Sequence, residues 1–298
     1  MGIEKNAINF RWLGTIPCFV TIFMLAGNIM TMPAWGASAE RETVETRNLL
    51  QKADDLWNNR ANQENLEAAI KAYENVIAED PDNLEALTKL ARAHYLLAYA
   101  YLENSDKKRQ IETYYKGVQY GEKGTALNPE FRKMIEAGKK MEEAIKVLGN
   151  EYLGAIYWTA SNLGKWAKAK GFLSILTHKD KAKKAMERII EIDERFFYGA
   201  PHRYLGAYYA FTPGIIGGDL KKSEEHFKKA LEIEPNYLGT WVLKADSLDT
   251  KLKDKDLYRR DIQHVIDAPV DSIPEIIPEQ IIEKQKAKML LEQIDSRF

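Results

Sequence analysis

One short stretch, FTPGIIGGDLKKS at residues 211–223, combines the residue types that bind phosphate. Glycines let a backbone approach a phosphate closely, and lysines supply positive charge. A phosphate loop of the Walker type needs the pattern G-x-x-x-x-G-K-[ST] directly after a strand. Here Asp219 follows the glycines, and the residues before them have a helical pattern. We therefore predict a turn between two helices, with Asp219 capping the second helix.

The residues of common catalytic and metal sites do not occur in the required patterns. There is no His-Glu-x-x-His pair and no Gly-x-Ser-x-Gly elbow, and the single cysteine is Cys18. The five histidines are scattered: His94, His178, His202, His226 and His264. We predict no enzyme, no metal site and no cofactor.

Aromatic residues are concentrated between residues 149 and 211, where the chain carries 12 of them. Trp158, Asn162 and Trp166 are spaced i, i+4 and i+8, which places them near one face of a helix, with Lys165 beside them. Two interpretations stay open. The aromatic residues form the core of a helical array, or they line a pocket in which Lys165 and Arg203 meet the anionic end of a ligand. The candidate binding residues are Tyr157, Trp158, Asn162, Lys165, Trp166, Arg203, Tyr204 and Asp219.

The first 39 residues have the pattern of a secretory signal peptide. Residues 12–39 carry no charge, and Ala37 and Ala39 form an A-x-A exit before Glu40. The apolar part is long enough that an uncleaved membrane anchor is the alternative. Cys18 follows Pro17 rather than a small residue, so lipidation is not expected. We predict export to the periplasm and a single domain at residues 40–298.

The charge balance excludes one class of partner. The chain has 43 basic and 44 acidic residues and a formal net charge of −1. Nucleic-acid binding requires a basic surface, so no nucleic-acid partner is expected. The charges are interspersed along the chain, as on the solvated faces of helices.

A repeated spacing of four, three and five residues indicates the fold. It joins Ala69, Tyr73, Val76 and Pro81, and it recurs in segments 117–129, 182–194 and 223–235. Small and aromatic residues at these steps allow two helices to pack closely, and the proline begins the next helix. This is the pattern of the second helix of a tetratricopeptide repeat, and the irregular intervals between copies indicate insertions. We predict an all-α fold, a curved array of degenerate tetratricopeptide-like helical hairpins.

Several motifs resemble one family. They are YWTASNLGKWA at residues 157–167, the segment 201–246, and the tail AKMLLEQIDSRF. Similar stretches recur in the TatT family, the T-components associated with tripartite ATP-independent periplasmic (TRAP) transporters. The resemblance covers roughly residues 45–298. Many members are lipoproteins, whereas this chain lacks a lipoprotein signal. Its sequence therefore does not support a lipid tether.

The resemblance implies a periplasmic helical-repeat partner of the substrate-binding P-component of a TRAP transporter. It also implies self-association and a cleft that handles a small organic ligand, apolar or carboxylate. The alternative is a general cell-envelope scaffold that binds peptides or assembly factors in its concave groove. We expect Trp158→Ala and Lys165→Ala to weaken binding without unfolding the array.

Overall fold

The computed structural model describes residues 35–103 and 105–298, and only the backbone of residues 35–43. The predicted signal peptide, residues 1–39, lies outside the described residues except for its last five, with which helix α1 begins. Within the described part of the chain, no helix has both the length and the apolar composition that a membrane crossing needs.

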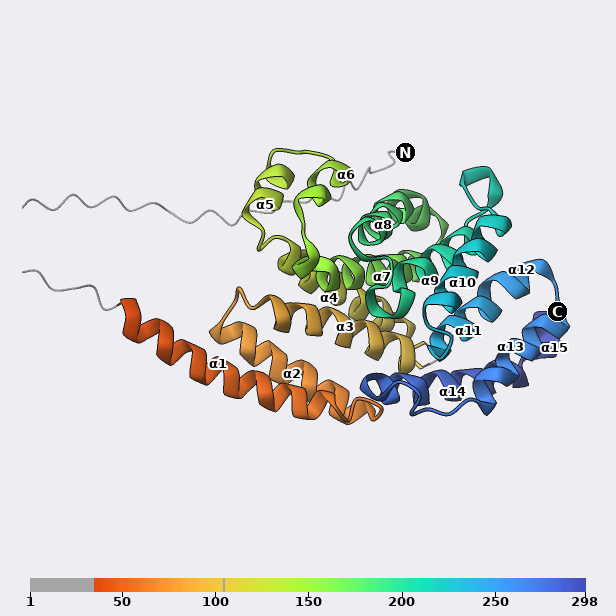
Figure 1. Cartoon of the computed structure of the whole chain (residues 1–298), viewed down its shortest axis with the longest axis horizontal. Coiled ribbons are helices and arrows are strands. Elements are labelled where there is room, and N and C mark those ends of the chain that lie inside the picture. The colour runs from red at the N-terminus through yellow and green to blue at the C-terminus, as the bar shows by residue number, and fades with distance from the viewer. Residues whose placement is uncertain (1–34, 104) are drawn as a thin grey trace, which may run out of the picture.

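Helical hairpins follow one another along the chain (Figure 1). In each hairpin a first helix packs against the second helix, and no strand interrupts the described residues. The all-α fold predicted from the sequence is therefore confirmed. The pairs are α1 (Trp35–Trp57) with α2 (Gln63–Glu79), α3 (Leu84–Ala100) with α4 (Lys107–Thr125), α7 (Leu153–Lys170) with α8 (Phe172–Asp193), and α9 (Phe196–Phe211) with α10 (Leu220–Ile233).

The last hairpin is irregular. Helix α11 (Leu238–Lys244) continues through a π-helical turn, η4 (Ala245–Asp249), into α12 (Thr250–Leu252), and packs against α13 (Lys255–Asp267). An insertion of short helices separates α4 from α7 and accounts for the longest interval between the repeated motifs. It consists of α5 (Pro129–Glu136), α6 (Met141–Ala144), η1 (Ile145–Val147) and η2 (Asn150–Tyr152).

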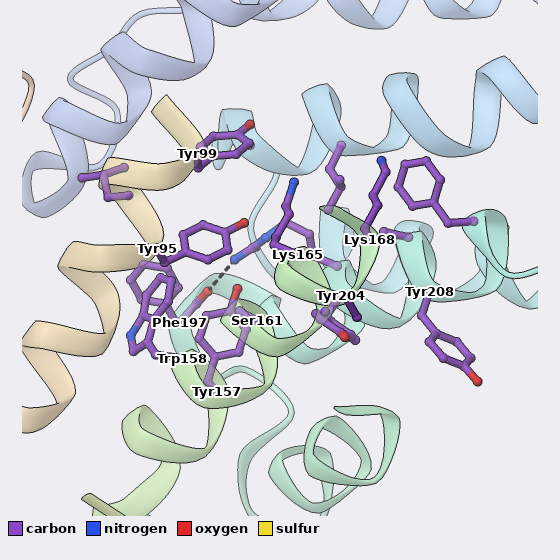
Figure 2. Close-up of a pocket in the computed structure, with 18 of the residues that line it drawn as sticks. Tyr95, Tyr99, Tyr157, Trp158, Ser161, Lys165, Lys168, Phe197, Tyr204 and Tyr208 are labelled. Atoms are coloured by element: carbon purple, nitrogen blue, oxygen red, sulfur yellow. Dashed lines mark hydrogen bonds between the residues drawn. The ribbon is translucent and has the colours of Figure 1, made fainter. Parts of the chain in front are cut away.

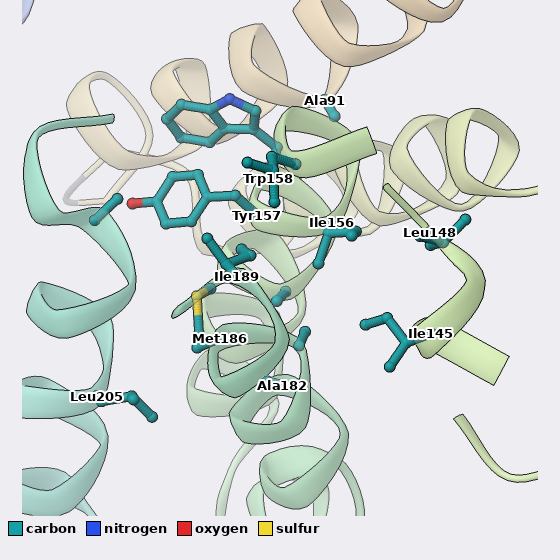
Figure 3. Packing of buried hydrophobic residues seen from close by; sticks show 14 of the residues in the cluster. Ala91, Ile145, Leu148, Ile156, Tyr157, Trp158, Ala182, Met186, Ile189 and Leu205 are labelled. Atoms are coloured by element: carbon teal, nitrogen blue, oxygen red, sulfur yellow. The ribbon is translucent and has the colours of Figure 1, made fainter. Parts of the chain in front are cut away.

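The repeated motifs lie on the second helices, where they pack against the first. Ala69, Tyr73 and Val76 on α2 are fully buried, as are Phe227 and its motif neighbours on α10. Figure 3 shows the largest core cluster, where Met186 and Ile189 of α8 lie beneath Tyr157 and Trp158 of α7. Close helix packing thus explains why the motif positions carry either small residues or large apolar ones.

The turn between α9 and α10 has the predicted character. It contains the 3₁₀ turn η3 (Gly214–Ile216), and Gly217 has a φ of 105°, which favours glycine. Asp219 is the N-cap of α10, because its Oδ1 accepts a hydrogen bond from the backbone N–H of Lys222 at 3.1 Å. The capping role predicted for Asp219 is confirmed.

The chain then returns across the array. After η5 (Pro274–Ile276), helix α14 (Ile277–Glu292) packs against α11 and α13, and α15 (Ile294–Arg297) ends the chain. Glu279 of α14 also forms ion pairs at 2.6 Å with Arg60, which follows α1, and with Arg92 of α3. Because these partners are about two hundred residues apart in sequence, α14 joins the last hairpin to the first two (Figure 1).

Candidate functional site

A cavity of about 250 Å³ lies between the first helices of the hairpins and α14. Residues of α3, α7, α9 and α11 form most of its wall. Helix α8 contributes Ile175, His178 and Lys179, and α14 contributes Glu279, Ile282 and Glu283. The wall is largely aromatic, as Figure 2 shows. Its aromatic residues include Tyr95, Tyr157, Trp158, Phe197, Tyr204 and Tyr237.

Five of the eight predicted binding residues line this pocket. They come from two helices, α7 and α9, whose neighbouring positions in the array bring them to one cavity. These residues are Tyr157, Trp158, Lys165, Arg203 and Tyr204. The aromatic segment therefore provides both core and pocket wall, because Tyr157 and Trp158 also belong to the largest core cluster.

The other three predicted residues lie elsewhere. Asn162 is fully buried between helices, and its Nδ2 donates hydrogen bonds to the backbone oxygens of Ala91 at 2.9 Å and Trp158 at 2.7 Å. Trp166 does not line the pocket, and its ring contacts the rings of Tyr115 and of the lining residue His178. Asp219 caps α10 and does not line the cavity.

Helical geometry explains why only some of the predicted residues of α7 face the pocket. Each step of four residues turns a side chain about 40° past its predecessor, so Trp166 lies about 80° from Trp158. The pocket face of α7 instead carries Trp158, Ser161, Lys165 and Lys168, spaced by three, four and three residues. Sequence spacing identified the helix but not its pocket face.

The first basic group of the pocket is already paired. Arg92 lies over the rings of Phe197 and Trp158, with its Cζ at 4.7 and 5.5 Å from the ring centroids. Its Nη2 also contacts Glu279 Oε1 at 2.6 Å. Burial opposes ionisation of Glu279, but Arg92 and Arg60 together hold the pKa of this carboxyl below its ordinary value. Glu279 is therefore ionised and neutralises part of the arginine charge.

Arg203 is buried without an acidic partner. Only 4% of its surface is exposed, and no described carboxylate lies within ion-pair distance. Its Nη1 donates to the backbone oxygen of Tyr198 at 3.0 Å, and its Nη2 donates to that of Phe197 at 3.4 Å. The guanidinium also lies 3.9 Å from the ring centroid of Tyr237. Arg203 thus carries a positive charge that forms no direct ion pair with a described carboxylate, although Glu283 interacts with it electrostatically.

The carbonyls that Arg203 binds belong to an unusual turn. Phe197, Tyr198 and Gly199 have φ values of 42°, 61° and 71°, so three consecutive residues are left-handed at the start of α9. Each non-glycine residue in this region costs about 1–2 kcal/mol. Such strain is concentrated at functional sites, and Phe197 lines the pocket.

Lys165 is a second basic group without an ion pair among the described residues. Its Nζ lies 4.8 Å from the ring centroid of Tyr99, and Lys286 Nζ lies 3.9 Å from the same ring. Burial, and then repulsion from Lys286, lowers the pKa of Lys165 to about 8. Lys165 is therefore mainly protonated at neutral pH, and a bound anion would stabilise its charge.

One acid of the lining faces these cations. Glu283 accepts a hydrogen bond from the Tyr99 hydroxyl at 3.0 Å, and burial raises the pKa of Glu283 above its ordinary value. The lining thus has five basic side chains against two acidic ones. Glu279 is neutralised by arginines, and Lys179 is paired with Asp180 outside the lining. The basic residues are Arg92, Lys165, Lys168, Lys179 and Arg203. This balance favours an anionic ligand.

Sequence reasoning missed the part of the pocket contributed by distant segments. Arg92, Tyr95 and Tyr99 lie on α3, and Glu279 and Glu283 lie on α14. The spacing of four between the two glutamates could have shown a shared helix face, but nothing local shows that this face is buried. Only long-range packing places these residues at the site.

Comparison with known proteins agrees with these features. A model of the TRAP transporter T-component family matches residues 61–298, which include every pocket residue. A search of curated proteins found no match. The family match covers most of the chain. This chain belongs to the TRAP transporter T-component family.

Proposed function

We propose that the protein is a periplasmic accessory of a TRAP transporter that docks the substrate-binding P-component. In this proposal, the pocket between the first helices and α14 receives an apolar or carboxylate ligand. Family membership supports the accessory role and a non-catalytic protein. Self-association, implied by the family resemblance, stays a prediction.

The pocket is the observation that supports ligand binding in this proposal. Apolar walls with a few placed polar groups are typical of small-molecule sites. Here the walls are aromatic, and Lys165 and Arg203 provide positive charge that no described carboxylate pairs. A packed core has no reason to retain unpaired cations, because their burial costs free energy.

The position of α14 favours this proposal over a general peptide-binding scaffold. Helical repeats bind peptides in the groove formed by their first helices. In this chain α14 already lies against that surface, with ion pairs from Glu279 to Arg60 and Arg92 and a hydrogen bond from Tyr99 to Glu283. A peptide would have to displace α14 and leave these buried groups unpaired.

A pull-down from periplasmic extract tests the docking half. The tagged protein is used as bait, and bound proteins are identified by mass spectrometry. We expect recovery of a solute-binding protein of the TRAP type. Recovery of outer-membrane assembly or cell-wall proteins without any such solute-binding protein would contradict the proposal and favour the scaffold alternative.

A further inference from the structure

Ser161 is a buried hydroxyl group without a partner at the pocket wall. Its side chain is 3% exposed, and its Oγ has no hydrogen-bond partner among the described residues. A helical serine or threonine commonly donates to the carbonyl four residues earlier, as Thr159 does to Ala155 O at 2.6 Å. Because a buried unpaired hydroxyl is costly, a ligand that pairs with Ser161 gains affinity.

Lys165 lies one helical turn after Ser161 on the same face of α7. Residues four apart are neighbours on a helix surface, and both side chains line the pocket (Figure 2). The hydroxyl donates one hydrogen bond and the ammonium up to three, and neither donates to a described residue. Two adjacent donors, one of them charged, match the two oxygens of a carboxylate.

The aromatic faces of the pocket disfavour a cationic ligand. Arg92 already lies over Trp158 and Phe197, and Arg203 lies over Tyr237. A ligand cation would compete with these arginines for the same rings. The remaining aromatic surface suits a neutral, apolar ligand body.

The opposite wall disfavours a second carboxylate. Glu283 comes from α14 and has no basic partner within ion-pair distance among the described residues, only the Tyr99 hydroxyl. A second anionic group near Glu283 would be repelled. The cavity volume of about 250 Å³ suits a small organic ligand.

We propose that Ser161 and Lys165 form the head-group site for a small amphipathic monocarboxylate, whose apolar body lies against the aromatic wall. The proposal rests on the ligand-binding half of the proposed function and gives that ligand a chemical class. Ser161 binds one carboxylate oxygen, and Lys165 neutralises the charge. The aromatic residues exclude water from the apolar end.

Calorimetric titration of the purified protein tests this assignment. The probe is 4-phenylbutyrate, with 4-phenylbutan-1-ol and succinate as matched ligands. The variants are Ser161→Ala and Lys165→Met, and Lys170→Met is the control because Lys170 is exposed at the end of α7. We expect Lys165→Met to weaken phenylbutyrate binding about tenfold or more, and Ser161→Ala about threefold or more.

The outcomes separate this proposal from the docking proposal. Wild-type binding of phenylbutyrate but not of the alcohol, with loss in both variants and none in Lys170→Met, supports the head-group site. Equal binding of acid and alcohol, tighter binding of succinate, or unchanged affinity in both variants overturns it. Failure to bind any of the three also overturns it, while the pull-down tests docking independently. We expect Ser161→Ala to keep the thermal stability of the wild type, because the substitution removes a hydroxyl that has no hydrogen-bond partner. A loss of binding in this variant therefore does not result from unfolding.

Discussion

Arg203 lies where a strained backbone turn meets the pocket wall. Its guanidinium donates to the backbone carbonyls of Phe197 and Tyr198. Both residues have positive φ values, a conformation that residues with a β-carbon rarely adopt. The charge of Arg203 thus has two effects, since it stabilises the left-handed turn and makes the pocket positive. One side chain therefore links the local backbone conformation to ligand preference.

Arg203→Lys should separate these two effects. Lysine keeps the positive charge but cannot bridge two carbonyls with a planar fork, so the turn loses stabilisation. We expect the free energy of unfolding to fall by about 2 kcal/mol in urea titration. Arg195→Lys is the control, because Arg195 is exposed at the same end of α9. An unchanged unfolding midpoint in Arg203→Lys would show that these bonds contribute little.

Trp158 requires a milder substitution than the sequence suggested. Its indole is 7% exposed and belongs to the largest core cluster, so Trp158→Ala leaves a cavity. We expect Trp158→Ala to lower the free energy of unfolding by about 3–5 kcal/mol, measured by chemical denaturation. Trp158→Phe keeps most of the apolar volume and is the variant to use in binding experiments. Equal stability of Trp158→Ala and wild type would argue that the indole is not a core residue.

At the scale of elements, the carboxylate of Glu279 holds α14 against the first two hairpins. Glu279 pairs with Arg60 and Arg92, so its substitution leaves two buried guanidinium groups without their acid. We expect Glu279→Gln to lower the free energy of unfolding by about 3–5 kcal/mol and to speed amide hydrogen exchange in α14. Glu275→Gln, at an exposed position just before α14, is the control. Unchanged exchange in α14 would show that apolar packing alone holds this helix.

A second buried ion cluster joins the π-helical turn η4 to α11 and α13. Lys244 Nζ lies 2.7 Å from Asp249 Oδ1 and 2.5 Å from Asp261 Oδ2, and both aspartates are 0% exposed. Burial raises the pKa of Asp249 to about 7, although Lys244 opposes the shift and Asp261 adds to it. Lys244 thus faces both carboxylates, and the exposed Arg260 adds a contact to Asp261 at 3.3 Å. A proton on Asp249 reduces the repulsion between the two acids.

This cluster predicts the direction of a pH effect on stability. Because the pKa of Asp249 is higher in the folded than in the unfolded chain, its stabilising contribution is full at low pH and is lost as pH rises through about 7. We expect the melting temperature of the wild type, relative to that of Asp249→Asn, to fall between about pH 4 and about pH 7 and to level off above that range. The measurement is a series of thermal scans over this range. A melting temperature of the wild type that rises with pH relative to that of Asp249→Asn would contradict the assignment.

For the whole molecule, α14 adds one wall to the pocket of the helical array. It packs against α11 and α13 at one end and contacts residues near α1 and on α3 at the other (Figure 1). Apolar residues of α14, including Ala287 and Leu290, are buried in this packing. The concave surface is therefore shaped by the C-terminal segment as much as by the hairpins.

Deletion of residues 277–298 tests this role of α14. We expect the shortened protein to keep most of its helical circular dichroism, because the four complete hairpins do not depend on α14 for their pairing. We also expect it to lose phenylbutyrate binding and to bind an apolar fluorescent dye more strongly, since the aromatic wall becomes exposed. Retained phenylbutyrate affinity would show that α14 is not a wall of the binding site.

The sequence alone determined the class of fold, the motif positions and the aromatic segment. Helical periodicity, the four-three-five spacing and the capping residue Asp219 are local properties, and each depends on neighbours within a few turns. For the same reason the sequence could identify α7 and α9 as carriers of candidate residues. It grouped Trp158, Lys165 and Arg203, which line one cavity, together with Asn162 and Trp166, which do not. Ligand binding by these residues stays a prediction.

Only the tertiary structure decided which residues face that cavity and what closes it. The pocket face of α7 depends on the rotation of the helix against α3 and α9, which a spacing pattern specifies only to within about 100°. The unpaired state of Ser161 and Lys165 depends on the absence of partners on neighbouring helices among the described residues. Glu279 and Glu283 reach the site through contacts almost two hundred residues away in sequence, because the packing of α14 sums many weak apolar contacts that no local pattern encodes.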